Sequence, residues 1–203
     1  MQPKSIILFF YGYILFFRRQ NIILFIVIVA IILGVIFFIK NHQNSYDFIL
    51  KSDLKEETTL KDFKGDKLII YFGYTYCPDV CPATLSLVGK ALKQINNPKA
   101  HLLFISLDPN RDNNLSNTNE WLRYFYPKAD ALIAKDEKTL QKITKQYNVQ
   151  YQKIDLNDSF MGYSIAHSNM LYLIDEKGHF YKEISDLNPQ EILRELRIFL
   201  NSQ

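Results

Sequence analysis

Two cysteines are the residues of this chain best suited to chemistry, and they stand close together as Cys77 and Cys81 in the sequence CPDVC. They are the only cysteines, and they fall between an apolar run typical of a buried strand and a predicted helix. Unpaired amides and partial positive charge at a helix N-terminus lower a thiol pKa and favour the thiolate. Because the thiolate binds metals and attacks disulfides, we interpret the pair as functional rather than as two structural thiols.

The spacing of the cysteines leaves two roles open. Three intervening residues separate the thiols by about one helical turn, so both sulfurs can bind one ion, but the same spacing also permits a disulfide. Thiolates are soft ligands that suit Cu(I) or Zn(II). Outside the cytoplasm, free thiols become oxidised unless a partner reduces them or a metal holds them. Two sulfurs rarely complete a site, so we expect a third ligand from elsewhere in the chain.

Four histidines are available as that third ligand. His42 lies in a predicted stalk, His101 begins a buried strand and His179 follows a hairpin turn, which are positions typical of surface or edge residues. His167 lies in a polar connection, residues 164–169, immediately before a predicted strand. If that strand neighbours the strand before Cys77, the connection faces the cysteine turn. His167 is then the best-placed histidine, although spacing alone leaves an ordinary surface role open.

Three other side chains near these positions each have two interpretations. Met161 is a soft thioether near the His167 connection, but a single methionine is usually core filler. Asp79, between the cysteines, either adds negative charge beside an ion or caps the helix. Asp108 begins the sequence DPNRD after the second buried strand. Its carboxylate either stabilises a turn or contacts a metal ligand without binding the metal itself.

Alternating strands and helices surround these motifs. We predict strands at residues 47–50, 58–60, 68–73, 101–107, 131–134, 170–174 and 179–184, and helices at 83–95, 117–126, 138–147 and 189–200. The two longest apolar strands have the composition of central, fully buried strands, and the last two strands flank the turn DEKG as a hairpin. This order predicts an α/β fold, a mixed sheet flanked by helices.

The N-terminal part of the sequence differs from the rest. Residues 21–39 contain eighteen consecutive apolar or glycine residues and no charge, enough for a helix that spans a bilayer. Arg18 and Arg19 precede this run and only Lys40 follows it closely, so the positive-inside tendency places the N-terminus in the cytoplasm or matrix. An uncleaved anchor fits better than a signal peptide, because the run is long and no small-residue cleavage site follows it.

We therefore divide the chain into an N-terminal segment (1–20), a transmembrane anchor (21–39), a polar stalk (40–46) and an outer domain (47–203). The apolar run at residues 6–17 is too short to span and is assigned no function. The chain has 24 basic and 21 acidic residues. Four of the basic ones precede residue 41, so the remainder is nearly neutral. That balance argues against a nucleic-acid binder.

Three sequence blocks together resemble the Sco (SenC) family. They are YFGYTYCPDVCP before a helix, SLDPNRD after the next strand, and AHSNMLYLIDEKG before the last hairpin, and the likeness covers residues 46–200. The resemblance implies a thioredoxin-like fold in which copper is bound by two cysteines and one histidine, corresponding here to Cys77, Cys81 and His167. It also implies a role in the assembly of respiratory cytochrome c oxidase, with the binuclear copper centre of subunit II as the target.

The sequence departs from the family pattern at two positions. Ala166 stands where the family often has an acidic residue, beside the histidine, and this puts in doubt the support of that ligand or its contact with a partner. Ala131 stands where a glycine is common, at the start of a short strand. Neither residue belongs to the implied ligand set.

Two functions remain. The leading hypothesis is a membrane-anchored copper metallochaperone that holds Cu(I), with Cu(II) accommodated by an added water or carboxylate. The alternative is a thiol–disulfide oxidoreductase that reduces the cysteines of the target site, with Cys77 attacking and Cys81 resolving. A peroxiredoxin-like peroxidase and a zinc hydrolase are less favoured, because no arginine-supported peroxidatic cysteine and no obvious general base beyond Asp79 or Asp108 are visible. The outer domain is expected in the bacterial periplasm or the mitochondrial intermembrane space.

Overall fold

A computed structural model describes residues 24–37, 46–157 and 159–202. Contacts divide the chain into two units, residues 1–44 and 45–203, and each unit is considered by itself. The elements of the second unit, in chain order, are η1 (Leu60–Phe63), β1 (Lys67–Gly73), α2 (Val80–Ile95), β2 (Ala100–Ser106), α3 (Leu115–Phe125), β3 (Ala129–Leu132), α4 (Glu137–Gln146), β4 (Tyr151–Asp155), β5 (Tyr163–His167), β6 (Leu171–Ile174), β7 (Phe180–Ile184) and α5 (Pro189–Asn201).

A five-stranded mixed sheet forms the centre of the second unit. Its strand order is β3-β2-β1-β6-β7, in which β1, β2 and β3 are parallel and β6 and β7 are antiparallel to their neighbours. Every residue of β1 and β2 is buried, as their continuous apolar sequences predict. Gly73 pairs with Ser106, so β1 and β2 end at the same edge of the sheet. The turns that follow these strands therefore lie beside each other.

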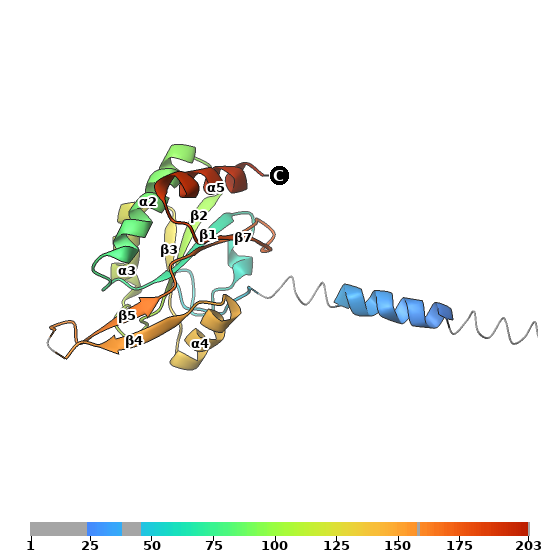
Figure 1. Cartoon of the computed structure of the whole chain (residues 1–203), viewed down its shortest axis with the longest axis horizontal. Coiled ribbons are helices and arrows are strands. Elements are labelled where there is room, and N and C mark those ends of the chain that lie inside the picture. The colour runs from blue at the N-terminus through green and yellow to red at the C-terminus, as the bar shows by residue number, and fades with distance from the viewer. Residues whose placement is uncertain (1–23, 38–45, 158, 203) are drawn as a thin grey trace, which may run out of the picture. The chain divides into compact units, whose positions relative to one another are not determined.

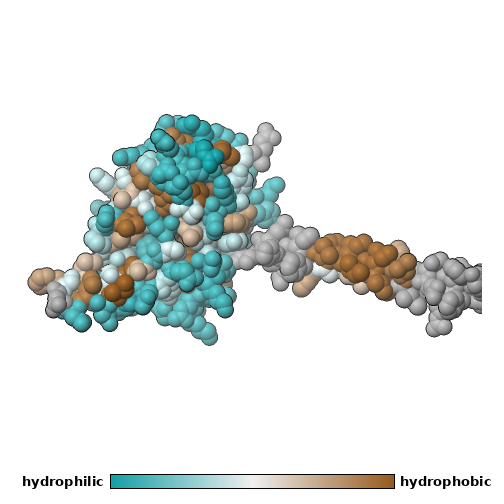
Figure 2. Space-filling view, viewed as in Figure 1, coloured by the Kyte–Doolittle hydropathy of each residue, from teal (hydrophilic) through white to brown (hydrophobic). Residues whose placement is uncertain are grey.

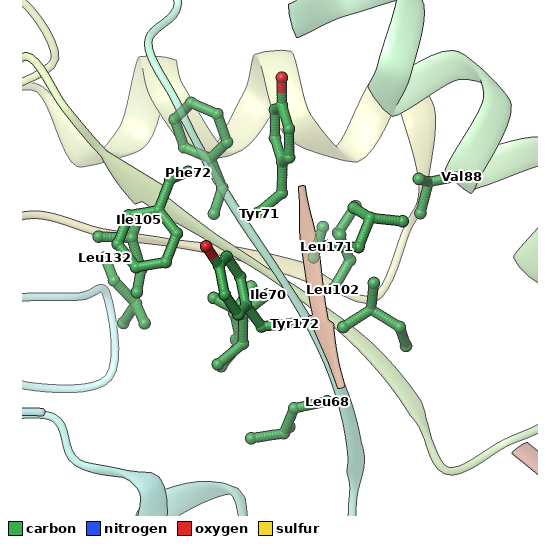
Figure 3. Packing of buried hydrophobic residues seen from close by; sticks show 14 of the residues in the cluster. Leu68, Ile70, Tyr71, Phe72, Val88, Leu102, Ile105, Leu132, Leu171 and Tyr172 are labelled. Carbon is green, nitrogen blue, oxygen red and sulfur yellow. The ribbon is translucent and has the colours of Figure 1, made fainter. Parts of the chain in front are cut away.

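Helices cover both faces of this sheet (Figure 1). The helix α2 contacts both α3 and α5 on one side, whereas α4 lies on the other side. Side chains alternate across β1 to fill both layers. Phe72 packs at a ring distance of 5.6 Å from Tyr172 and 5.1 Å from Tyr147, which follows α4. Figure 3 shows the hydroxyl of Tyr71 pointing away from the ring of Tyr172.

Local sequence signals explain where several helices begin and end. At α2, Asn96 ends the helix in the left-handed conformation, with φ of 52°, ahead of Pro98. At α5, Pro189 occupies the first turn and the Asn188 side chain accepts hydrogen bonds from two backbone amides. The amphipathic helices then bury their apolar stripes against the sheet.

The predicted α/β architecture is confirmed, and the structure corrects two details. Residues 47–50 and 58–60 form only an isolated bridge between Leu50 and Thr58, followed by the short helix η1. A separate two-stranded sheet, β4–β5, is present where the sequence analysis placed no strands. Most residues of β4 are exposed, so its sequence YQKID lacks the apolar pattern that reveals a buried strand.

Residues 24–37 form a helix in which every residue is exposed. Figure 2 shows its surface as strongly apolar. Among the described residues, no helix combines the length and the apolar character that a membrane span requires. The predicted anchor, residues 21–39, extends at both ends beyond the described helix, and the short run at residues 6–17 lies outside the described residues.

The last residue of β1, Gly73, allows α2 to approach the sheet closely. A Cβ atom at this position would lie 3.0 Å from Cε1 of Tyr71, 3.0 Å from Cε2 of Phe104 and 3.1 Å from Sγ of Cys81. These distances are shorter than ordinary van der Waals contacts. The absence of a side chain at Gly73 therefore determines how near the Cys81 sulfur lies to the end of β1.

We predict that Gly73→Ala destabilises the protein by about 1–3 kcal/mol, because the added methyl group overpacks a site closed on three sides. Urea unfolding followed by tryptophan fluorescence, with Trp121 as the only tryptophan, measures the change. An unfolding free energy equal to that of the wild type would show that the neighbouring rings and α2 move aside without cost.

Candidate metal centre

Cys77 and Cys81 lie on the turn and first residues that connect β1 to α2. The backbone amide of Cys77 donates to the Tyr74 carbonyl at 3.2 Å, which closes a turn directly after the strand. Cys81 is the second residue of α2, and its amide donates to Sγ of Cys77 at 3.4 Å. Both thiols are free; Cys77 is half-buried and Cys81 is fully buried. The predicted placement of the pair at the connection between a strand and a helix is confirmed, except that α2 begins at Val80, before the predicted start, and so includes Cys81.

The electrostatics of Cys81 differ from the expectation of a lowered thiol pKa. Burial raises the pKa of the Cys81 thiol to about 12, and the hydrogen bond from the Tyr74 backbone opposes this shift only in part. The expectation was therefore wrong for Cys81, because the apolar surroundings disfavour the thiolate more than the helix N-terminus favours it. The metal-free protein holds this sulfur as a neutral thiol.

His167 is the last residue of β5, and not part of a polar connection as predicted. Its Nε2 lies 3.5 Å from Sγ of Cys81, across 86 residues of sequence. Its Nδ1 lies 3.0 Å from the Ser168 carbonyl oxygen, which can only accept a hydrogen bond, so Nδ1 carries the proton. Burial lowers the pKa of His167, partly offset by that bond. The imidazole is therefore neutral at pH 7, with the Nε2 lone pair facing Cys81.

The separation of these two atoms suits a pair of ligands on one ion. Sulfur and imidazole nitrogen bind an ion such as zinc at about 2.3 Å and about 2.0 Å, which places the two atoms about 3.5 Å apart at an angle of about 110°. Taken as they stand, no three His, Cys, Asp or Glu side chains within the described ranges form a group that holds a metal ion. The Cys77 sulfur instead contacts the Cys81 amide.

Aromatic rings enclose the inner side of His167. The rings of Tyr71 and Tyr74 stand edge-on to the imidazole, with centroids 6.3 Å and 6.2 Å away. The Tyr71 hydroxyl is buried without a hydrogen-bond partner among the described residues. Burial raises the pKa of this hydroxyl, and charge repulsion from Cys81 raises it further. On the outer side, an open pocket of about 340 Å³ exposes His167 to solvent; it is lined by Gln150, Tyr151, Gln152, Ala166, His167 and Ser168.

The other candidate side chains do not face the sulfurs in the described contacts. Asp79 is exposed at the N-cap position of α2, but its side chain makes no capping hydrogen bond. Met161 contributes its backbone carbonyl, which accepts a hydrogen bond from Arg111. Asp108 is buried in a turn, where its carboxylate accepts from Arg111 and from the Tyr163 hydroxyl. Asp108 therefore forms part of the turn after β2 and also contacts the strand that carries His167.

The remaining histidines have other surroundings. His101 is buried between Asp66 and Asp130, with each ring nitrogen 2.8 Å from a carboxylate oxygen. His179 is partly exposed and lies 3.4 Å from Asp175. His42 lies outside the described residues. Of the histidines in the described part of the chain, His167 is the one that contacts a cysteine.

Arg111 and Asp112, within the motif DPNRD, have roles that the sequence alone did not indicate. Asp112 is buried, and its carboxylate accepts hydrogen bonds from the Thr75 amide and hydroxyl and from the Ser106 hydroxyl. Burial raises the pKa of Asp112 despite these bonds. The turn after β2 thus holds the cysteine turn after β1. The available signal was the shared sheet edge, at which the ends of parallel strands meet.

Comparisons with known proteins find relatives by sequence and by structure. An SCO2-like protein of Rickettsia felis is 33% identical over 154 residues, which cover 74% of this chain and 74% of the relative. The crystal structure of Arabidopsis thaliana ScoI with copper bound matches with a TM-score of 0.67 at 28% identity, covering 74% of this chain and 94% of that one.

The fold extends to more distant proteins. The thioredoxin domain of a thiol-disulfide oxidoreductase from Bacteroides vulgatus matches with a TM-score of 0.54, covering 76% of this chain and 94% of that one. At 14% identity this likeness shows the fold alone, and it confirms the thioredoxin-like prediction. The family described as SCO1/SenC matches residues 39–200. The chain therefore belongs to the SCO1/SenC family.

Proposed function

We propose that this protein is a copper metallochaperone that binds one Cu(I) through Cys77, Cys81 and His167. The observation that carries the proposal is the 3.5 Å approach of a neutral His167 Nε2 to the Cys81 sulfur. Two thiolates and one imidazole form a soft ligand set, which suits Cu(I). A relative in the same family, the Arabidopsis protein, has been solved with copper bound. To complete the site, the Cys77 sulfur leaves the Cys81 amide and joins the other two ligands.

The position of the site suits the transfer of an ion. Cys77 is partly exposed and the pocket beside His167 is open, whereas Cys81 is buried. An incoming cysteine of a partner can therefore reach the copper from the exposed side and displace one ligand at a time. A three-coordinate ion leaves room for that additional ligand. The proposed recipient is the binuclear copper centre of cytochrome c oxidase subunit II.

We also propose that residues 21–39 anchor the protein in a membrane, with residues 40–46 as the stalk and 47–203 as the copper domain. The support is the charge-free apolar run together with Arg18 and Arg19 before it. In this arrangement the copper domain lies in the periplasm or the intermembrane space. An anchor restricts the search for a membrane-bound oxidase to two dimensions.

A second candidate function is thiol–disulfide exchange with the same target. The observation that favours it is the unequal exposure of the thiols, because a partly exposed Cys77 and a buried Cys81 match an attacking and a resolving cysteine. This chemistry does not require His167. The histidine therefore distinguishes the two candidates.

The first test is Cu(I) binding by the reduced full-length chain in detergent, measured without oxygen in competition with a calibrated chelator. We expect one tightly bound copper per chain. The Cys77→Ser/Cys81→Ser variant loses it. His167→Ala weakens binding by at least about 100-fold, because mutating a residue that only supports a ligand already costs about 10- to 100-fold. His179→Ala is the matched control, because His179 follows the end of β6 that pairs with the start of β1, whereas the cysteines follow the end of β1.

The opposite result would be that the chelator removes all copper from the wild type while a Cys77–Cys81 disulfide cycles rapidly. That result would contradict the chaperone function and favour the oxidoreductase function. His167→Ala could also keep disulfide reduction but lose delivery of copper. That outcome would show that redox activity alone is not the function.

The affinity for Cu(I) should rise with pH. In the metal-free protein the Cys81 pKa is raised to about 12, so binding displaces a proton from this thiol at neutral pH. His167, with its lowered pKa, is already neutral above about pH 6.5 and adds no slope. Between pH 7 and about pH 9 the Cys81 proton alone raises the association constant about tenfold per pH unit.

Competition titrations at several pH values, corrected for the protonation of the chelator, measure this slope. An association constant that stays flat across the range would show that the Cys81 thiol is already ionised or does not bind the metal.

A further inference from the structure

The strand that carries His167 is not part of the central sheet. Strands β4 and β5 pair only with each other, and residues 152–155 of β4 are exposed. Inter-strand hydrogen bonds therefore do not join this hairpin to the central sheet. Two kinds of contact then set the position of His167 relative to Cys81. Beside His167, the short connection to β6 is held to α2 by hydrogen bonds between Asn169 and Thr84. The rest of the hairpin is held by side-chain contacts with the domain.

Arg111 makes several polar contacts at the turn end of the hairpin, where β5 begins four residues before His167. Its Nη1 donates to the carbonyl oxygen of Tyr163 at 3.1 Å and to that of Met161 at 3.3 Å. Its guanidinium lies 3.7 Å from the centroid of the Tyr163 ring. The Tyr163 hydroxyl donates to Asp108 at 2.9 Å, and Asp108 also pairs with Arg111. Arg111 and Asp108 thus hold the first residue of β5 at both its backbone and its side chain.

The same arginine faces the cysteine turn. Its guanidinium lies 4.8 Å from the Tyr76 ring centroid and 5.7 Å from that of Tyr74. The neighbouring Asp112 binds Thr75. A direct link between the two segments is the hydrogen bond from the Ile165 amide to the Tyr74 hydroxyl, at 3.3 Å. Arg111 therefore lies between the turn that carries Cys77 and the strand that carries His167.

We propose that Arg111 is a positioning residue that holds the β4–β5 hairpin against the cysteine turn and so keeps His167 Nε2 beside Cys81. This inference rests on the proposed copper site. The Arg111 side chain is only 15% exposed, and a planar guanidinium can donate to a carboxylate and to two carbonyls while it stacks on a ring. A lysine has one ammonium group and no planar face, so it cannot replace these contacts.

The test is a double-mutant cycle of Arg111→Lys and His167→Ala, with Cu(I) affinity measured on the full-length chain. In the wild-type background Arg111→Lys weakens Cu(I) binding by about tenfold. In the His167→Ala background it weakens binding by less than about twofold, because a displaced hairpin no longer carries a ligand. Equal losses in the two backgrounds, or no loss in the wild type, would overturn the proposal.

Hydrogen exchange of the metal-free protein provides a measurement that does not depend on copper. Arg111→Lys should raise the exchange rates of the β5 amides about tenfold while β1 amides keep theirs. Tyr163→Phe, which keeps the stacked ring and loses only the bond to Asp108, should give a smaller increase. Arg123→Lys is the matched control, because Arg123 pairs with Asp130 away from the hairpin. Unchanged β5 exchange in Arg111→Lys would overturn the proposal.

The two measurements separate failure of this inference from failure of the copper site. If His167→Ala alone leaves Cu(I) affinity unchanged, the proposed ligand set is wrong, and the exchange rates still decide whether Arg111 holds the hairpin.

Discussion

The contact between the Cys81 sulfur and Nε2 of His167 joins two segments 86 residues apart, and the rest of the site is arranged around it. Gly73 lets the sulfur lie close to the end of β1, since a Cβ atom there would be 3.1 Å from it. The Ser168 carbonyl accepts a hydrogen bond from the protonated Nδ1, which leaves the Nε2 lone pair toward the sulfur. Close packing at Gly73 thus positions the Cys81 sulfur, and the hydrogen bond to Ser168 orients the His167 ring. Together they bring a neutral thiol and a neutral imidazole into contact.

Neutrality is the main electrostatic property of this pair in the metal-free domain. Burial raises the pKa of Cys81 and lowers that of His167, so neither group carries charge at pH 7. A buried thiolate without a cation would cost several kcal/mol, and the protein avoids that cost by keeping the proton. Binding a soft cation reverses the balance, because the ion replaces the proton. Burial therefore couples metal binding to proton release.

The sequence could predict the parts of this site that depend on local pattern. The spacing of Cys77 and Cys81, the apolar run before them and the helix after them all correspond to the structure. His167 was expected near the cysteine turn, but its strand was not expected, because YQKID is mostly exposed and YSIAH, in which only Ile165 is buried, lacks a continuous apolar run. The pKa of Cys81 could not be predicted, since burial depends on how α2 packs against β1. Arg111 was visible only as part of a turn motif, because the Met161 carbonyl that it binds lies 50 residues away.

The central claim is that one copper ion is bound by two sulfurs and one imidazole. Cu K-edge X-ray absorption of the Cu(I)-loaded full-length chain tests it most directly, because the fine structure distinguishes sulfur from nitrogen neighbours. We expect a three-coordinate ion with two sulfur ligands and one histidine nitrogen, and loss of the nitrogen in His167→Ala. A two-coordinate spectrum with sulfur alone, identical in the wild type and in His167→Ala, would contradict it.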